Sequence, residues 1–367
     1  MSFRNLIKQL MPLSLAQKYR ARNSFATMFK QTGYDENCEF PDEESKFKSI
    51  ISVQGFGYSG SGALIDFFRE YPKFAVLGYV DVKGEGGGYT PKSMQLSEID
   101  FIRLSGGLFE IEKYIGSRNN FFNDALLNRT VQLFGSSSLY RCNSHIRDLM
   151  FRFFAKIAYL RLENLSQPYY NSYTVGLNET PDLYFLKQMP REEYIQLCRR
   201  FLNSVFNEFC STGKEFMVGD QLLSDGDYDV KRNKEYIPNL KMIMVTRDPR
   251  DTYAWAIKRN VEWMGHQSVE TFIEWYKNVY SYVNPSNNTL DCLVVRYEDL
   301  IFDYDNQERI INNYLGVAPK DHELRQQYFR PDYSKRYVGI YKEMLDRADE
   351  FALIRAALPD YCYSMID

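Results

Sequence analysis

The strongest constraint on the fold is an alternation of short apolar strands with amphipathic helices. Residues 49–55 (SIISVQG) form a β-branched run that ends in glycine, and residues 63–71 (ALIDFFREY) place Leu64, Phe68 and Tyr71 on one helical face. Further patterns typical of strands lie at 74–80, 215–221, 241–247 and 291–297, and a helical pattern covers 191–210. The last two strand patterns are almost continuously apolar, as strands covered on both faces require. This alternation predicts an α/β fold with a doubly wound parallel sheet and helices on both faces.

The chain of 367 residues is long enough for one large domain or two modest ones. Residues 1–34 contain six Lys or Arg and no acidic residue, and residues 35–44 contain six acidic side chains, so we interpret 1–47 as a basic N-terminal arm and an acidic linker. We assign 48–342 to the α/β domain and 343–367 to a C-terminal helix and tail. Within the domain, residues from about 83 to 187 are interpreted as a mostly helical insertion that includes an aromatic helix at 149–162.

Charge and cysteine usage limit the function classes. Charged residues make up 25% and the formal net charge is −3, so the chain is globular but not a general polyanion binder, and any anion site must be local. We therefore expect no nucleic-acid partner. The six cysteines form no CxxC pair, which favours buried thiols in a reducing compartment. The sequence shows neither a run of roughly 20 apolar residues nor a signal peptide, so we expect a cytoplasmic protein. The basic arm could lie on an anionic membrane surface or pack as a terminal helix.

The glycine-rich segment after the first strand has the pattern of an anion cradle. A turn from Gly57 to Gly62 between a strand and a helix directs main-chain amides and a helix N-terminus at one point, and Ser59 and Ser61 add hydroxyl donors. A plain tight turn explains the same glycines. The triphosphatase version needs a lysine followed by Ser or Thr, but Ser61 and Gly62 occupy those positions. This argues against ATP or GTP hydrolysis and against a nucleotide kinase.

Three later segments share the character of phosphate-binding sites. In VTRDPRDTYAW (245–255), Arg247 ends a strand and Pro249 opens a helix, which is a suitable place for an arginine to contact a phosphate. The segment VVRYEDLI (294–301) ends another strand. In YFRPDYSKRYVGIYK (328–342), Lys335 and Arg336 stand close to a glycine.

In this order the four segments resemble the sulfotransferases that use 3′-phosphoadenosine 5′-phosphosulfate (PAPS), most closely the bacterial branch that modifies carbohydrates and lipids. The resemblance covers roughly residues 48–342, with the insertion unmatched. It implies a P-loop-type fold and transfer of a sulfuryl group from PAPS to a hydroxyl of a glycan or lipid-linked acceptor, without a metal. It also implies that Arg247 binds the 3′-phosphate while Lys335, Arg336 and Gly339 close over the same end. The residues implied to wrap the 5′-phosphosulfate are Gly57, Tyr58, Ser59, Gly60, Ser61 and Gly62.

Two positions depart from the family pattern. The family usually has Lys or Arg where this chain has Tyr58, and a tyrosine supplies no positive charge to the departing bridge oxygen. It usually has Ser where this chain has Trp255, and Thr252 or main-chain groups could substitute. An active enzyme would need another cation, for which the candidates are Lys83, Arg103 and Lys187. The alternative is a catalytically impaired nucleotide-binding protein with the same fold.

The acceptor hydroxyl must lose a proton, so a carboxylate base is expected. Glu98 and Asp100 stand two positions apart and face the same way on an extended segment. Glu85 and Asp220, the latter at the end of a strand, are the alternatives. We expect a structural role for the lone His145, and we expect Tyr297 and Glu298 to brace the neighbouring loops.

Overall fold

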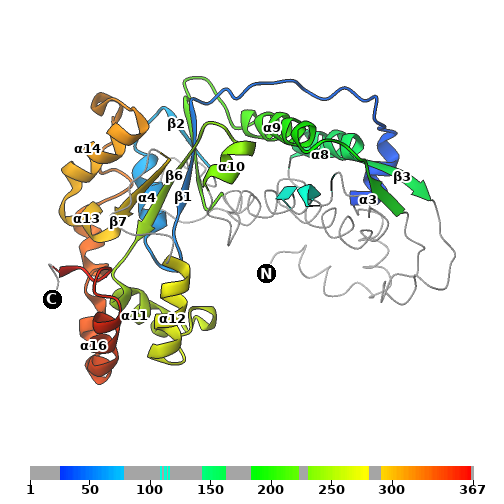
Figure 1. The fold of residues 1–367 in the computed structure, drawn as a ribbon. Helices are drawn as coiled ribbons and strands as arrows, with labels where there is room; N and C mark the ends of the chain where they lie inside the picture. Colours follow the sequence, from blue (N-terminus) through cyan, green and yellow to red (C-terminus); the bar gives the residue numbers. More distant parts are fainter. Residues whose placement is uncertain are drawn as a thin grey trace, which may run out of the picture. The chain divides into compact units, whose positions relative to one another are not determined.

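The computed structural model describes most of the chain and divides it into two compact units (Figure 1). Unit 1 comprises Met1–Glu44 and Arg103–Glu208, and unit 2 comprises Ser45–Ile102 and Phe209–Asp367. The described residues are 25–77, 108–109, 111–113, 115, 143–162, 183–222, 230–280 and 291–364. Among them, no helix is both long and apolar enough to cross a membrane. None of the five cysteines in these ranges forms a disulfide.

Unit 2 is built on a five-stranded parallel sheet with the order β2-β5-β1-β6-β7. The strands are β1 (Ser49–Gln54), β2 (Phe74–Val76), β5 (Phe216–Asp220), β6 (Leu240–Thr246) and β7 (Cys292–Arg296). Each of the five strand patterns in the sequence produces one of these strands, and the predicted parallel sheet is confirmed. The pattern at 74–80 continues beyond β2 into residues 78–80, which lie outside the described ranges.

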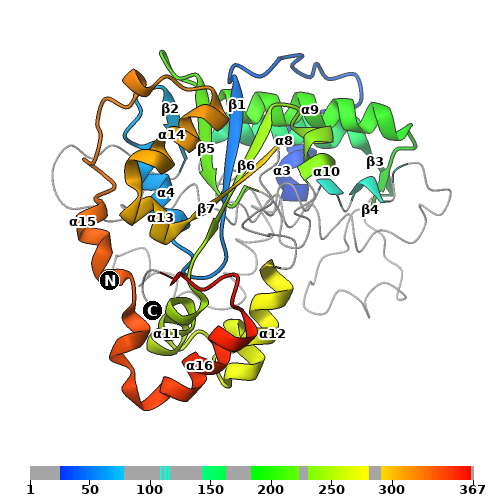
Figure 2. The ribbon, with the colours of Figure 1, turned by 60° about the vertical axis from the view of Figure 1, so that its left-hand side comes forward.

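Helices cover both faces of this sheet, as predicted. On one face, Ile51, Val53 and Val245 pack under α4, α13 and α14. On the other face, Met244 belongs to one buried cluster with Tyr253 of α11 and with residues of α12 and α16. Figure 2 shows these helices as two separate groups. The helices of unit 2 are α4 (Ser61–Phe68), α10 (Val230–Tyr236), α11 (Pro249–Arg259), α12 (Val269–Tyr280), α13 (Tyr297–Phe302), α14 (Tyr304–Leu315), α15 (Pro331–Ser334) and α16 (Ala348–Ala357). Its 3₁₀ turns are η3 (Glu262–Met264), η4 (Pro319–Asp321), η5 (Lys335–Tyr337), η6 (Ile340–Glu343) and η7 (Leu345–Arg347).

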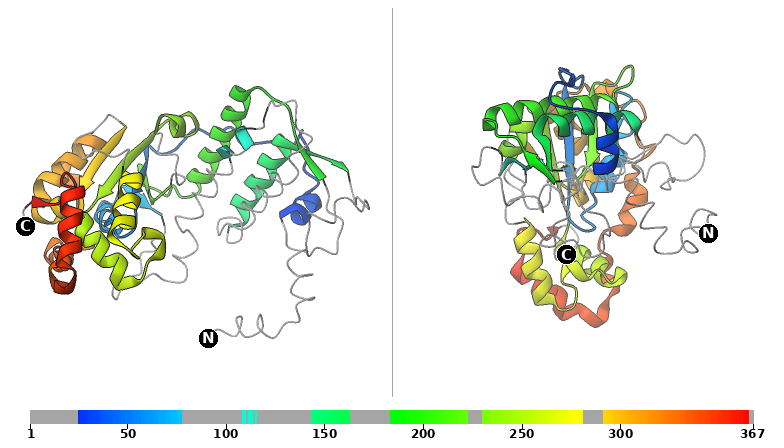
Figure 3. Two further views of the ribbon diagram at one scale, coloured as in Figure 1. Left: turned by 60° about the horizontal axis from the view of Figure 1, so that its bottom comes forward. Right: turned by 90° about the vertical axis from the view of Figure 1, so that its right-hand side faces the viewer.

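Unit 1 contains helices α3 (Phe25–Thr32), α8 (Ser144–Ile157) and α9 (Arg191–Asn207) and an antiparallel pair of strands, β3 (Ala158–Leu162) and β4 (Leu183–Leu186). Helices α8 and α9 are neighbours (Figure 3), and their rings interlock: Phe153 stacks on Phe201 with centroids 4.5 Å apart. The predicted helix at 191–210 is confirmed, because α9 begins at Arg191 and ends at Asn207, three residues earlier than predicted.

The predicted helix at 149–162 is wrong after Ile157. Ala158 adopts extended backbone angles (φ −133°, ψ 159°), and the chain continues as β3. The Ala158 amide still donates to the Phe154 carbonyl and closes α8, but Ala158 is also paired with Leu186 of β4, and from here the chain runs along a strand instead of continuing the helix. The extended conformation of residues 158–162 is therefore set by pairing with β4, which lies further along the chain.

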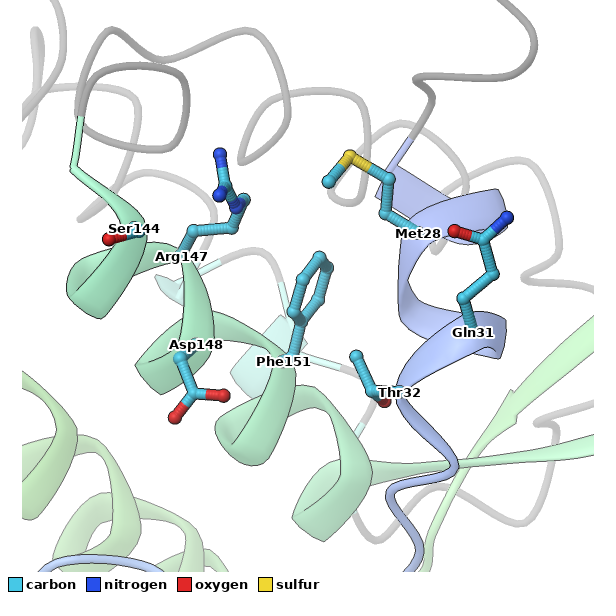
Figure 4. Close-up of a pocket in the computed structure, with 7 residues that line it drawn as sticks. All are labelled: Met28, Gln31, Thr32, Ser144, Arg147, Asp148 and Phe151. Atoms are coloured by element: carbon cyan, nitrogen blue, oxygen red, sulfur yellow. The ribbon is translucent and has the colours of Figure 1, made fainter.

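Helices α3 and α8 border a cavity of about 280 Å³ (Figure 4). Figure 4 shows Met28 and Arg147 on opposite sides of this hollow, with the Phe151 ring between them. The other lining residues are Gln31, Thr32, Ser144 and Asp148. The sequence patterns did not single out this hollow.

Candidate functional site

The glycine-rich segment forms a tight turn between β1 and α4 in unit 2. The Ser59 amide donates to the Phe56 carbonyl at 3.0 Å, and the Ala63 amide donates to the Gly60 carbonyl at the same distance. Tyr58 (φ 57°) and Gly60 (φ 94°) both adopt left-handed backbone conformations. The turn therefore delivers the chain directly into α4. The Ala63 amide is thus already bonded, but the first amides of a helix have no intrahelical acceptor, so those of Ser61 and Gly62 are available to an anion.

Close approach explains three of the glycines. A Cβ atom on Gly57 would lie 2.6 Å from the Met264 sulfur, and one on Gly60 would lie 2.4 Å from a ring carbon of Tyr297. A Cβ atom on Gly55 would meet the loop itself, at Ser59. Gly62 differs, because a Cβ atom there would have no heavy atom of the described chain within 4 Å. Among the described residues, the N-terminal turn of α4 is thus open at Gly62, as a cradle requires and a packed turn does not.

Arg247 follows β6 and connects this turn to the late segment of the chain. Its side chain is only 5% exposed. One terminal nitrogen donates to the Tyr58 carbonyl at 3.1 Å, and the other donates to the Tyr337 carbonyl. The guanidinium also lies 4.9 Å from the centre of the Tyr297 ring. The glycine-rich turn, the RDPRD segment, the YEDL segment and the late segment therefore meet at one arginine.

The YEDL segment braces this junction, as the sequence predicted. An oxygen of Glu298 accepts a hydrogen bond from the Asp248 amide at 2.9 Å. Glu298 is fully buried, and its burial raises the pKa of the carboxyl to about 8. Asp248 in turn caps α11, because its carboxylate accepts from the Arg250 amide at 2.8 Å. The start of α11 is therefore fixed from two sides.

The sequence patterns missed one buried carboxylate, Asp251. It accepts from the Gly339 amide at 2.7 Å and from the Tyr341 amide at 3.3 Å. It also lies 3.6 Å from a terminal nitrogen of Arg247. Burial raises its pKa to about 6, against the opposing effects of Arg247 and the two amides. The only sequence signal was its place four residues after Arg247, in the first turn of α11.

The predicted cations of the late segment lie on its exposed side. Lys335 donates to Asp332 at 2.8 Å, and the Arg336 guanidinium lies 3.6 Å from the centre of the Tyr333 ring. Arg336 also donates to the Tyr337 hydroxyl at 2.6 Å. Because the Tyr337 carbonyl accepts from Arg247, the turn that carries both cations adjoins the same junction.

Aromatic rings occupy the two positions that depart from the family pattern. Tyr58 is 40% exposed and stacks on Trp255 with a centroid distance of 5.8 Å and an interplanar angle of 13°. Trp255 also contacts the Tyr337 ring at 6.1 Å. Thr252, which could have replaced the missing serine, is buried, and its hydroxyl donates to the Asp248 carbonyl at 3.1 Å. It is thus engaged within its own helix.

Most residues proposed as the base or the replacement cation lie outside the described ranges, namely Lys83, Glu85, Glu98, Asp100 and Arg103. Asp220 is described, and it ends β5 in register with Val53 of β1, so it lies at the same edge of the sheet as the glycine-rich turn. Lys187 lies in unit 1, where its ammonium donates to the Ala155 carbonyl at 2.8 Å and lies 3.4 Å from Glu36. Within the described residues, no group of three or more His, Cys, Asp or Glu side chains could hold a metal ion.

No protein-family model matches this chain, and no curated protein matches it. Among solved structures, the sulfotransferase domain of the olefin synthase from Synechococcus PCC 7002 is 12% identical, with a TM-score of 0.38, covering 88% of this chain and 98% of that one. Sulfotransferase STF9 from Mycobacterium avium is 10% identical, with a TM-score of 0.38, covering 87% and 76%. Retinol dehydratase in complex with androsterone and inactive cofactor PAP is 10% identical, with a TM-score of 0.30, covering 86% and 81%.

Proposed function

We propose that this protein is a sulfotransferase that takes a sulfuryl group from PAPS and transfers it to a hydroxyl of a glycan or a lipid-linked acceptor. The observation that carries the proposal is the position of Arg247, which donates to the Tyr58 carbonyl in the glycine-rich turn and to the Tyr337 carbonyl in the late segment. The donor carries anionic groups at both ends of an adenosine. A site for it therefore needs two anion-binding elements in one place, and the junction at Arg247 joins two such elements.

The described residues fit the two ends of such a donor. The open N-terminal turn of α4, from Ser61, would hold the 5′-phosphosulfate through main-chain amides. A guanidinium carries five N–H groups, so Arg247 keeps donors for a 3′-phosphate after its two bonds to carbonyls. Lys335 and Arg336 would add positive charge at that end, and the positive φ of Gly339 lets the segment turn back onto α11.

The proposed reaction is a single in-line displacement. The acceptor oxygen forms a bond to sulfur while the bond between sulfur and the bridging oxygen breaks, which yields a sulfate ester and adenosine 3′,5′-bisphosphate. The acceptor proton passes to a carboxylate. As in phosphoryl transfer, the protein then contributes positioning and electrostatic stabilisation. Asp220 is the described candidate for the base, while Glu85, Glu98 and Asp100 stay open.

One observation favours a second candidate, a nucleotide-binding protein with impaired catalysis. Tyr58 stands where the family has a cation, and its ring is stacked on Trp255. A phenol can donate a hydrogen bond to the bridging oxygen but brings no charge to it. In this alternative the nucleotide binds and the sulfuryl group is not transferred.

Two measurements separate these candidates. A ligand that binds only the folded protein raises its melting temperature, so adenosine 3′,5′-bisphosphate should stabilise this protein and ATP should do so less. A stronger effect of ATP, or none from the bisphosphate, would refute both candidates. Transfer of labelled sulfate from PAPS to a cell-envelope extract then identifies an enzyme, and binding without transfer identifies the impaired form.

The cellular location of the protein and its contact with a membrane are still predictions. A cytoplasmic location and contact of residues 1–34 with a membrane rest on the sequence, and residues 1–24 lie outside the described ranges. Sedimentation with anionic lipid vesicles tests the membrane contact. Loss of binding at high salt would agree with the basic arm, and binding that persists after its removal would contradict the prediction.

A further inference from the structure

We propose that Asp251 is a positioning residue for the nucleotide, because it holds the late segment 335–341 against the arginine that reaches the glycine-rich turn. This inference rests on the proposed function. Asp251 is fully buried, so it has no surface with which to touch a ligand directly. Its effect must pass through the groups that it contacts.

The first contacts are main-chain amides of the late segment. Gly339 donates to one carboxylate oxygen at 2.7 Å, and Tyr341 donates to the other at 3.3 Å. The carboxylate lies in the first turn of α11, where the helix dipole favours negative charge. These two bonds attach residues 339–341 to α11, directly after the turn that carries Lys335 and Arg336, and the Arg250 guanidinium of α11 also lies 4.5 Å from the centre of the Tyr341 ring.

The second contact is Arg247. One Asp251 oxygen lies 3.6 Å from the Arg247 nitrogen that donates to the Tyr337 carbonyl. The Asp251 carboxylate thus fixes the late segment twice, once directly and once through the guanidinium. The other terminal nitrogen of Arg247 donates to the Tyr58 carbonyl, so the same carboxylate also influences the spacing between the two phosphate-binding elements.

Removal of the carboxylate should weaken nucleotide binding and should change the transfer rate at saturating donor much less. In Asp251→Ala, the Gly339 and Tyr341 amides lose an acceptor and the buried Arg247 guanidinium loses a counter-charge, so the late segment no longer has a fixed distance from the glycine-rich turn. A buried donor without a partner costs about 1–3 kcal/mol, which corresponds to a rise of about 5- to 150-fold in the Kd for the bisphosphate if the cost falls on the closed segment. Asp251→Asn keeps one acceptor oxygen, so its effect should lie between those of wild type and alanine.

The experiment compares wild type, Asp251→Asn, Asp251→Ala and the control Asp346→Asn. The control removes an acidic charge from the exposed turn η7. Calorimetric titration with adenosine 3′,5′-bisphosphate gives each Kd, and labelled PAPS gives the rate at saturating donor. Hydrogen exchange without nucleotide gives the protection of residues 335–341. We expect faster exchange there and a higher Kd in the order wild type, Asn, Ala, with a saturated rate close to wild type for Asp251→Asn and no change for the control.

The outcomes separate this inference from the proposed function. If wild type binds the bisphosphate and Asp251→Asn matches it in both Kd and exchange, the positioning role is overturned while the proposed function stands. If Asp251→Asn lowers the saturated rate and leaves the Kd unchanged, the role is also overturned. If wild type does not bind the bisphosphate, the proposed function fails and the nucleotide role fails with it. Because Asp251→Asn is nearly isosteric, it serves as the test if the alanine variant does not fold.

Discussion

Replacing Gly60 by alanine should destabilise unit 2 and weaken nucleotide binding together. Gly60 has a φ of 94°, which L side chains rarely adopt, and a Cβ atom there would lie 2.4 Å from a ring carbon of Tyr297. That ring cannot retreat easily, because it is buried and the Arg247 guanidinium lies 4.9 Å from its centre. The substitution therefore forces either the turn or the junction at Arg247 to shift.

The size of the effect follows from two costs. A left-handed backbone costs an L residue about 1–2 kcal/mol, and an extra carbon in a packed interior costs about 1–3 kcal/mol. Their sum is about 2–5 kcal/mol. In a domain of 150–250 residues each kcal/mol shifts Tm by about 2–4 °C, so a fall of roughly 4–20 °C is expected.

Gly62→Ala is the matched control, two residues away. A Cβ atom on Gly62 meets no described atom within 4 Å, and alanine is favoured over glycine inside a helix by about 1 kcal/mol. We expect Gly62→Ala to keep or raise Tm in a thermal melt, but to weaken binding of the bisphosphate because the new methyl group enters the open side of the cradle. Equal melting temperatures for the two variants would refute the packing argument. Unchanged binding in Gly62→Ala would refute the cradle.

Three further substitutions test the junction. Burial raises the Glu298 pKa from 4.5 to about 8, so the folded state binds a proton that the unfolded state releases, and stability should fall by about 1.4 kcal/mol per pH unit as pH rises from 4.5 to 8. Glu298→Gln should flatten this slope in melts between pH 6 and 8, and an identical slope would contradict the assignment. Arg247→Ala should lower stability by about 2–4 kcal/mol and abolish the thermal response to the bisphosphate, so a retained response would remove Arg247 from the site. Tyr58→Lys should raise the transfer rate by less than about tenfold (about 1.4 kcal/mol in the barrier) if another cation already serves the bridging oxygen, and a much larger gain would show that none does.

The sheet could be predicted because its signal is local. Each strand of unit 2 is a short apolar run. The nearly continuous run at β6 records burial on both faces, whereas β7, at the edge of the sheet, alternates between buried and half-buried residues, so its apolar run did not mean full cover on both faces. The end of α8 could not be predicted in this way. Residues 158–162 become extended because β4 pairs with them, and that partner begins at Leu183, beyond any helical or strand period that a local window can read.

The same distinction applies to the site. The glycine-rich turn and Arg247 were visible because strand ends and glycines mark them in the sequence. The role of Asp251 was not visible, because its partners Gly339 and Tyr341 lie 88 and 90 residues further along the chain. Nor could the sequence show that the Trp255 ring would stack on Tyr58, since the two residues come from loops and helices that follow different strands.

The central claim is that the glycine-rich turn and the late segment bind one doubly phosphorylated adenosine. Hydrogen exchange with and without adenosine 3′,5′-bisphosphate tests it most directly. We predict that the nucleotide slows exchange in residues 55–62 and in residues 335–341 over the same range of concentrations. Protection of only one of these segments, or of neither, would contradict the claim.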